Sequence, residues 1–169
     1  MRAESHDAPI RIRPIAPADD PTVAAIIRAT LREHGCTGPG FALHDPEVDR
    51  MSAAYPGGRA QYDVVEAGGF VVGGAGFGPL DGADPDAQIC ELRKMYFAPS
   101  LRGRGVGRQL LEGLLERMRD AGYRRCYLET ARVMRPAQAL YRKLGFDTLP
   151  GPLGDTGHGA CDVFFAREL

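Results

Sequence analysis

The segment SLRGRGVGRQLLEGLL, residues 100–115, constrains the fold more than any other part of the chain. Closely spaced glycines and arginines run directly into a leucine-rich helical pattern. A helix N-terminus carries unpaired backbone N–H groups and a partial positive charge, and glycines let an anion approach these groups closely. The segment therefore predicts an anion site at the start of a helix, with a loop of solvent-facing arginines as the alternative. The residues concerned are Gly103, Gly105, Gly107, Arg102, Arg104 and Arg108.

Composition excludes several classes of protein. The chain has 169 residues and a formal net charge of -1, so we expect one domain and no general attraction to nucleic acid or to an anionic membrane. No apolar run approaches the roughly 20 residues of a membrane-spanning helix, and residues 1–9 do not resemble a signal peptide. We therefore expect a cytoplasmic protein with a flexible tail at 1–9 and a single domain at 10–169.

The cysteines lack the spacing of a metal site. Cys36, Cys90, Cys126 and Cys161 form no CxxC pair and have no nearby histidine at ligand spacing. We expect reduced, mostly buried thiols rather than disulfides or metal ligands, and hence no metal.

Hydrophobic periodicity and turn residues divide the chain into strands and helices. Strand patterns occupy residues 10–15, 88–97, 124–130 and 160–168, and a hairpin with a Gly-Gly turn occupies 61–80. Helical patterns occupy 16–35, 106–122 and 135–146, with a weaker one at 44–55. The order βααβββαβαβ predicts an α/β layer with a mixed sheet.

Two segments depart from a simple strand pattern. In QICELRKMYF, residues 88–97, apolar and charged residues do not alternate cleanly, which indicates either a bulge or charged side chains facing a cleft. In GGAGFG, residues 73–78, the composition resembles a phosphate loop, but a turn follows instead of a helix. We therefore expect an ordinary strand that is rich in glycine.

Two known phosphate motifs fit the 102–108 segment poorly. A P-loop requires Lys and then Ser or Thr after its last glycine, where this chain has Arg108 and Gln109. A dinucleotide fold requires its third glycine where Arg108 stands, directly after a strand. Because Glu129 lies at about the distance of a ribose-binding acid, the dinucleotide fold stays open as an alternative.

Two motifs together resemble the GNAT superfamily of acyl-CoA-dependent N-acyltransferases. RGRGVG, residues 102–107, fits the family's pyrophosphate loop R/Q-x-x-G-x-G/A after a strand that ends in MYF, and ALYRKLGF, residues 139–146, is similar to its LYxKxGF helix. The motifs occur in the family's order, separated by one helix and one strand. The resemblance implies an α/β fold whose mixed, mostly antiparallel, twisted sheet has six to seven strands, helices on both faces and a central splayed strand pair.

The resemblance also implies acetyl-CoA as cosubstrate. Backbone amides from Gly103 through Arg108 would receive its pyrophosphate, and the preceding strand would pair with its pantetheine arm, with an amide near Phe97 polarising the thioester carbonyl. Many relatives carry Asn at the position of Met134, so contact there would be apolar or come from elsewhere. The cofactor-binding residues expected are Met95, Tyr96, Phe97, Arg102, Gly103, Arg104, Gly105, Val106, Gly107, Arg108 and Met134.

Tyr141 matches the general acid that the family uses to protonate the departing thiolate. A tyrosine pKa of about 10 lies near or above that of a thiol, which suits this transfer. The alternative is an aromatic residue that merely packs beside Leu140 and Leu144.

An ammonium acceptor must lose a proton before it can attack. Glu91 and Glu129 lie on strands at spacings that occur for bases in the family. Either could instead form an ion pair with a nearby cation, for which the candidates are Arg93, Lys94 and Arg132.

The sequence thus predicts an N-acetyltransferase that moves an acetyl group to a primary amine, in a small molecule or a peptide, by direct attack. A CoA-binding sensor or interaction module without turnover is the alternative, motivated by Met134. No motif identifies the acceptor or a homodimer interface, although dimers are common in the family. The loop residues expected to select the acceptor are Glu33, His34, Phe41, His44 and His158.

Overall fold

A computed structural model describes residues 8–169 of the chain. The strands are β1 (Ile10–Pro14), β2 (Gln61–Ala67), β3 (Phe70–Pro79), β4 (Ile89–Phe97), β5 (Arg125–Thr130), β6 (Asp147–Leu149) and β7 (Val163–Glu168). The helices are α1 (Asp20–Glu33), α2 (Met51–Ala54), α3 (Val106–Asp120) and α4 (Arg135–Lys143). The predicted tail lies mostly outside the described residues, and within the rest Pro9 accepts a hydrogen bond from the Gly68 amide at 3.4 Å.

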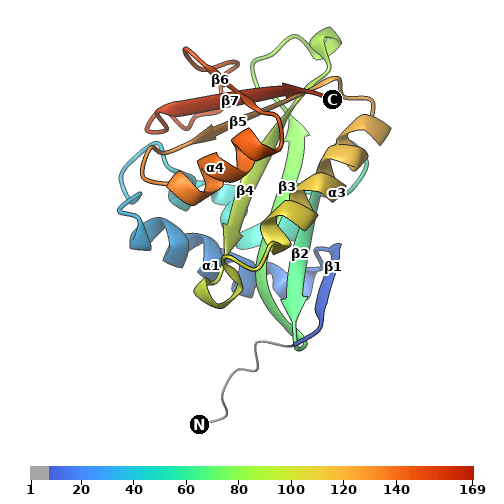
Figure 1. Ribbon diagram of the computed structural model, residues 1–169, viewed down its shortest axis with the longest axis vertical. Helices are drawn as coiled ribbons and strands as arrows, with labels where there is room; N and C mark the ends of the chain where they lie inside the picture. Colours follow the sequence, from blue (N-terminus) through green and yellow to red (C-terminus); the bar gives the residue numbers. More distant parts are fainter. Residues whose placement is uncertain (1–7) are drawn as a thin grey trace.

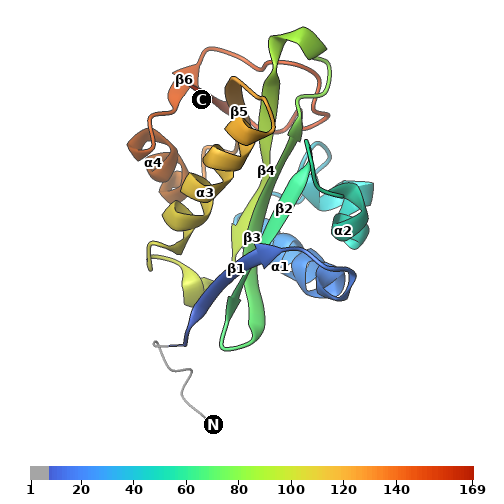
Figure 2. The ribbon, with the colours of Figure 1, turned by 90° about the vertical axis from the view of Figure 1, so that its right-hand side faces the viewer.

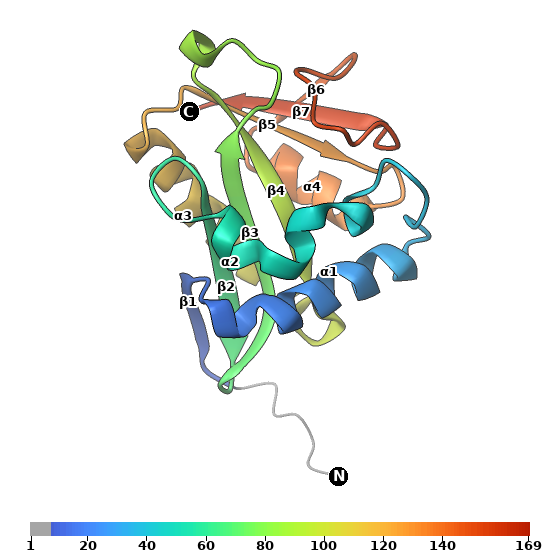
Figure 3. The same cartoon turned by 180° about the vertical axis from the view of Figure 1, so that it is seen from behind.

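The seven strands form one sheet in the order β1-β2-β3-β4-β5-β7-β6 (Figure 1). Every neighbouring pair is antiparallel except β4 and β5, which confirms the predicted mixed, mostly antiparallel sheet. Helices α3 and α4 cover one face, and α1 and α2 cover the other (Figures 2 and 3). The sequence patterns missed β6, because three residues are too few to show a strand period. No helix among residues 8–169 combines the length and apolar character needed to cross a bilayer.

The leucine stripe of α3 anchors the core on its face of the sheet. All six apolar residues of this stripe are buried, and they pack with residues of β3, β4 and β5. Burial of one such side chain contributes roughly 1.5–3 kcal/mol, so the stripe offsets the roughly 1 kcal/mol that a glycine costs a helix. The stripe residues are Val106, Leu110, Leu111, Leu114, Leu115 and Met118.

The parallel neighbours β4 and β5 separate along their length. They pair only from Ile89–Glu91 on β4 and Arg125–Tyr127 on β5, although β4 continues to Phe97 and β5 to Thr130. Beyond this point the two strands leave an opening in the middle of the sheet. This is the central splayed strand pair that the family resemblance implied.

A β-bulge in β4 accompanies this separation. On β3, Ala75 alone lies between the residues that pair with Arg93 and Tyr96, whereas β4 has both Lys94 and Met95 in the same interval. Lys94 takes a φ of 50°, which is uncommon for a residue with a side chain. The bulge explains why apolar and charged residues fail to alternate along this strand.

The glycines of β3 make room for side chains that fix the bulge. Tyr62 on β2 donates its hydroxyl to the Lys94 carbonyl at 2.9 Å. A Cβ on Gly74 would lie 2.6 Å from the Tyr62 ring and 2.7 Å from the Asp63 carbonyl. The GGAGFG segment is therefore a strand, as predicted, and its glycines permit close approach by a neighbouring strand.

We expect Gly74→Ala to destabilise the protein by about 1–3 kcal/mol, because the added methyl group overpacks the Tyr62 contact. Gly113→Ala is the matched control, since that helical glycine has no atom within 4 Å of an added Cβ, and it should stabilise by up to about 1 kcal/mol. Chemical denaturation of both variants measures the difference. Equal stability of Gly74→Ala and the wild type would contradict the role assigned to Gly74.

Candidate active site

A large cleft of about 410 Å³ lies in the opening between β4 and β5 and reaches the start of α3. Most of the residues predicted to bind the cofactor line this cleft. Arg104 is not among the lining residues, and the side chain of Val106 is buried in the core. The predicted residues that line it are Met95, Tyr96, Phe97, Arg102, Gly103, Gly105, Gly107, Arg108 and Met134.

The glycines leave the start of α3 open to the cleft. Gly103 and Gly105 have φ values of +73° and +76°, and a Cβ on either would meet no atom within 4 Å. No side chain caps the helix at Gly105. Gly107 lies closer to the strand, because a Cβ there would be 3.4 Å from Met95 and Phe97. The first amides of α3 are thus accessible to an anion in the cleft.

Two of the loop arginines are already paired with carboxylates. Arg102 binds both oxygens of Glu33 at 2.7 and 2.8 Å, and its Nε donates to the Phe97 carbonyl at 3.1 Å. Arg108 binds Glu112 one helical turn away, at 2.8 Å. Arg102 therefore ties together α1, β4 and the loop, and Glu33 lies at this contact.

Tyr141 faces the large cleft from α4. Its ring packs on Phe146 and Phe165, at centroid distances of 5.8 and 5.7 Å. Burial raises the pKa of Tyr141, so its hydroxyl keeps its proton until a strong base is adjacent. The residue is thus a packed aromatic that also lines the cleft, so its packing is compatible with the predicted role as a proton donor.

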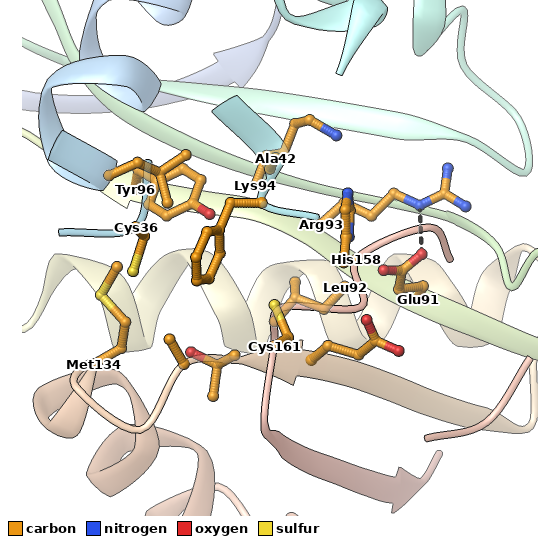
Figure 4. Close-up of a pocket in the computed structure, with 15 residues that line it drawn as sticks. Cys36, Ala42, Glu91, Leu92, Arg93, Lys94, Tyr96, Met134, His158 and Cys161 are labelled. Atoms are coloured by element: carbon orange, nitrogen blue, oxygen red, sulfur yellow. Dashed lines mark hydrogen bonds and ion pairs between the residues drawn. The ribbon is translucent and has the colours of Figure 1, made fainter. Parts of the chain in front are cut away.

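A second, small cavity of about 60 Å³ lies beside the cleft. Its two ends differ in chemistry: Glu91, Arg93 and His158 lie at one end, and Cys36, Tyr96 and Met134 at the other (Figure 4). The remaining lining residues are Leu31, Phe41, Ala42, Leu92, Lys94, Glu129, Thr130, Ala131 and Cys161.

The two spaces share a boundary. Tyr141 lines only the large cleft and Glu91 lines only the small cavity, whereas Glu129 lines both. Molecules bound in the two spaces would therefore meet beside Glu129. The boundary residues, which line both spaces, are Leu92, Lys94, Tyr96, Glu129, Thr130 and Met134.

Glu91 is buried and paired. Its Oε2 accepts a hydrogen bond from Arg93 Nε at 2.9 Å, as the ion-pair alternative proposed. Burial raises the pKa of Glu91 more than Arg93 lowers it, and the nearby charge of Glu129 acts in the same direction as burial.

Glu129 is held by two hydroxyl groups. Tyr127 donates to its Oε1 at 2.7 Å and Thr156 donates to its Oε2 at 2.6 Å. Each hydroxyl oxygen also accepts a backbone amide, from Leu153 at 3.1 Å and from His158 at 3.2 Å. With those acceptor positions used, both hydroxyl protons are directed at the carboxylate. Glu129 thus forms none of the three ion pairs considered from sequence, with Arg93, Lys94 or Arg132.

A buried charge network lies behind the boundary and was not found from sequence. The bulge turns the Lys94 side chain, only 3% exposed, toward Asp45 at 2.8 Å and toward Glu47. Asp45 also binds His158 Nε2 at 2.8 Å. These residues come from three separate segments, so no local spacing could reveal the network. It joins the segment after α1 to the loop before β7.

The other loop residues expected to select the acceptor are dispersed. Phe41 lines the small cavity, His34 lines the large cleft, and the His44 ring bonds the Thr37 carbonyl at 2.8 Å. Across residues 8–169, no group of three or more His, Cys, Asp or Glu side chains is placed to hold a metal ion. All four cysteines are free, and Cys161 is the one that is partly exposed.

Comparison with known proteins identifies similar chains. The model of the acetyltransferase (GNAT) family matches residues 21–146. The chain is 43% identical over 152 residues to the "Uncharacterized N-acetyltransferase YjgM" of Escherichia coli (strain K12), covering 89% of this chain and 90% of that protein.

Solved structures share the fold at low sequence identity. An acetyltransferase of the GNAT family from Staphylococcus aureus superposes with a TM-score of 0.79 at 18% identity, covering 95% of this chain and 99% of that one. The yncA protein of Salmonella typhimurium, solved with its cofactor acetyl-CoA, gives a TM-score of 0.73 at 23% identity, covering 95% and 94%.

We expect the contribution of His158 to stability to fall at high pH. Its hydrogen bond with Asp45 raises the pKa of His158, and burial opposes this rise. Glu91 adds a smaller increase and Lys94 a smaller decrease. A group whose pKa is raised on folding stabilises fully below its unfolded pKa, about 6.5, and loses that contribution as the pH rises through the folded value.

His158→Gln should therefore destabilise the protein more at about pH 6 than at about pH 9. The difference in the free energy of unfolding should be on the order of 1 kcal/mol or less, and it should appear as a larger drop in melting temperature at the lower pH. Thermal unfolding of both proteins across this range measures the difference. A pH-independent difference would show that the ion pair with Asp45 is not its source.

Proposed function

The chain belongs to the acetyltransferase (GNAT) family, and we propose that it transfers the acetyl group of acetyl-CoA to a primary amine by direct attack of the amine. The observation that supports this most is the shared boundary of the large cleft and the small cavity. The cleft has accessible helix amides at one end, and the boundary carries a carboxylate held in place. Two reactants bound in these spaces would meet there without moving through the protein.

The residues of the cleft suit acetyl-CoA. The open amides at the start of α3 support binding of a pyrophosphate group there, and the part of β4 that is not paired with β5 could bind an extended amide-containing chain through its backbone. Acetyl-CoA, when bound, supplies the activated acetyl group as a thioester. Met134 lines the cleft where many relatives have Asn, so we propose that this contact is apolar.

We propose that the thioester carbonyl is polarised between Lys94 and Tyr96. Phe97, the position expected from sequence, lines the cleft beside Gly107 but does not reach the boundary. The bulge turns the backbone of β4 at Lys94, where both spaces meet. A fixed amide at this point would stabilise charge that develops on the carbonyl oxygen.

We propose that Glu129 accepts the proton of the ammonium and that Tyr141 protonates the departing thiolate. Glu129 lines both spaces, whereas Glu91 lines only the small cavity and is engaged by Arg93. The orientation of the Glu129 carboxylate is set by the Tyr127 and Thr156 hydroxyls. Tyr141 lines the cleft but not the small cavity. It would therefore lie on the side of the acyl donor, whose thiolate leaves.

The function is tested by incubating the protein with acetyl-CoA and a panel of primary amines while thiol release is followed. We expect Tyr141→Phe to lower kcat roughly 10²-fold, because the proton donor is lost, and to leave the thermal shift produced by CoA intact. A sensor without turnover predicts the same thermal shift and no effect of Tyr141→Phe on any reaction. Failure of every amine to exceed background hydrolysis, without a thermal shift by CoA, would reject the proposal.

The two glutamates are distinguished by paired substitutions. We expect Glu129→Gln to lower kcat/KM roughly 10²-fold near neutral pH, because the general base is lost, and Glu91→Gln to lower it less than about tenfold. The Glu129→Gln deficit should shrink as the pH approaches the acceptor's own pKa, near 10 for an alkylamine, because a neutral amine needs no base. Melting temperatures control for misfolding, and the reverse ranking would assign the base to Glu91.

A further inference from the structure

Every cation that lines the small cavity already has an anionic partner. Arg93 is paired with Glu91 at 2.9 Å. Lys94 is paired with Asp45 at 2.8 Å and with Glu47. His158, the remaining basic side chain in the lining, is paired with the same Asp45. No cationic group of the lining is thus available to a substrate carboxylate.

Glu129 differs from the other carboxylates of this region. Among residues 8–169 its partners are the neutral hydroxyls of Tyr127 and Thr156, and no cation is paired with it. Its carboxylate lies at the boundary with the large cleft, and no ion pair within residues 8–169 neutralises it. A substrate ammonium can supply the missing positive charge.

Resting on the proposed function, we infer that the acceptor is a primary amine that carries no carboxylate beside its amino group, and that the small cavity discriminates against α-amino acids. An α-carboxylate would lie next to the amino group and hence near Glu129 and Glu91. It would lose its hydration without gaining a cation, and it would be repelled by the unpaired carboxylate of Glu129.

The shape and lining of the cavity limit the rest of the acceptor. A volume of about 60 Å³ is several times the roughly 10–15 Å³ that one water needs. The end away from Glu91 carries Cys36, Tyr96 and Met134 (Figure 4), and the apolar side chains of Leu31 and Phe41 are also part of the lining. The acceptor is therefore a compact alkylamine whose uncharged carbon skeleton contacts this end.

Matched pairs of compounds that differ only by a carboxylate test the inference. Suitable pairs are isobutylamine with valine, 2-methylbutylamine with isoleucine, and isoamylamine with leucine. With acetyl-CoA as donor and thiol release as readout, we expect kcat/KM to be at least about tenfold higher for the amine of an accepted pair, since a carboxylate beside Glu129 meets a like charge without a cation to offset it. A ratio below tenfold, or a preference for the amino acid, would overturn the inference.

A binding measurement separates this inference from the proposed function. Thermal shifts are recorded for the same pairs in the presence of CoA, which reports recognition without turnover. If no compound releases thiol but the amines, unlike the amino acids, raise the melting temperature, catalysis fails and the inference stands. If turnover is observed with amino acids as the better acceptors, catalysis stands and the inference fails. If neither turnover nor an amine-specific shift occurs, both are rejected.

A substitution at Glu47, a partner of Lys94, tests whether cation pairing causes the preference for amines over amino acids. Glu47→Gln removes one of the two carboxylates that hold Lys94, which leaves its charge less compensated and should narrow the amine-to-amino-acid ratio at least about threefold. Asp49→Asn is the control, because Asp49 lies in the same segment but is 66% exposed and paired with Arg28. An unchanged ratio in folded Glu47→Gln would show that cation pairing does not set the preference.

Discussion

The separation of β4 from β5 is the constraint on which the rest of the site depends. Parallel strands normally pair along their length, and here pairing ends after Glu91 and Tyr127. The bulge at Lys94 bends β4 at this point, and the Tyr62 hydroxyl fixes the bulge through the Lys94 carbonyl. Backbone groups that would otherwise complete the sheet are thereby left for a ligand. The opening is built into the strand and does not depend on a mobile loop.

The same bulge arranges the charges around the opening. A residue that kept the regular alternation would direct its side chain to the other face, whereas the left-handed backbone at Lys94 sends the amine toward Asp45 and Glu47. Burying an ammonium is costly unless it is paired, so these carboxylates are needed for the bulge to fold. Because Asp45 and Glu47 pair with Lys94, Lys94 is not available to pair with Glu129. The Glu129 carboxylate therefore faces both spaces without a cationic partner among residues 8–169.

Much of this architecture could be predicted because the signals were local. The leucine stripe, the glycine-rich helix start and the disrupted alternation of residues 88–97 each lie within one short segment. The pairing of Tyr127 with Glu129 is also local, since residues two apart share a face of a strand, but the pattern alone does not indicate a hydrogen bond. Contacts of Lys94 with Asp45 and Glu47 join residues far apart in sequence, and short β6 has no period to detect. Long-range contacts of this kind require the folded structure.

The loop before β7 links the orientation of Glu129 to the shape of the small cavity. Thr156 directs its proton at Glu129, the adjacent His158 binds Asp45, and the Leu153 amide fixes the Tyr127 hydroxyl. This loop therefore orients the Glu129 carboxylate and contributes to the wall of the small cavity, while β4, β5, α3 and α4 all line the cleft. A change in the loop can alter acceptor choice without altering the cleft, but a change that displaces Thr156 also alters how the carboxylate is held. In the proposed mechanism, acceptor choice and proton transfer are thus coupled through one segment, whereas the binding of the acyl donor is not.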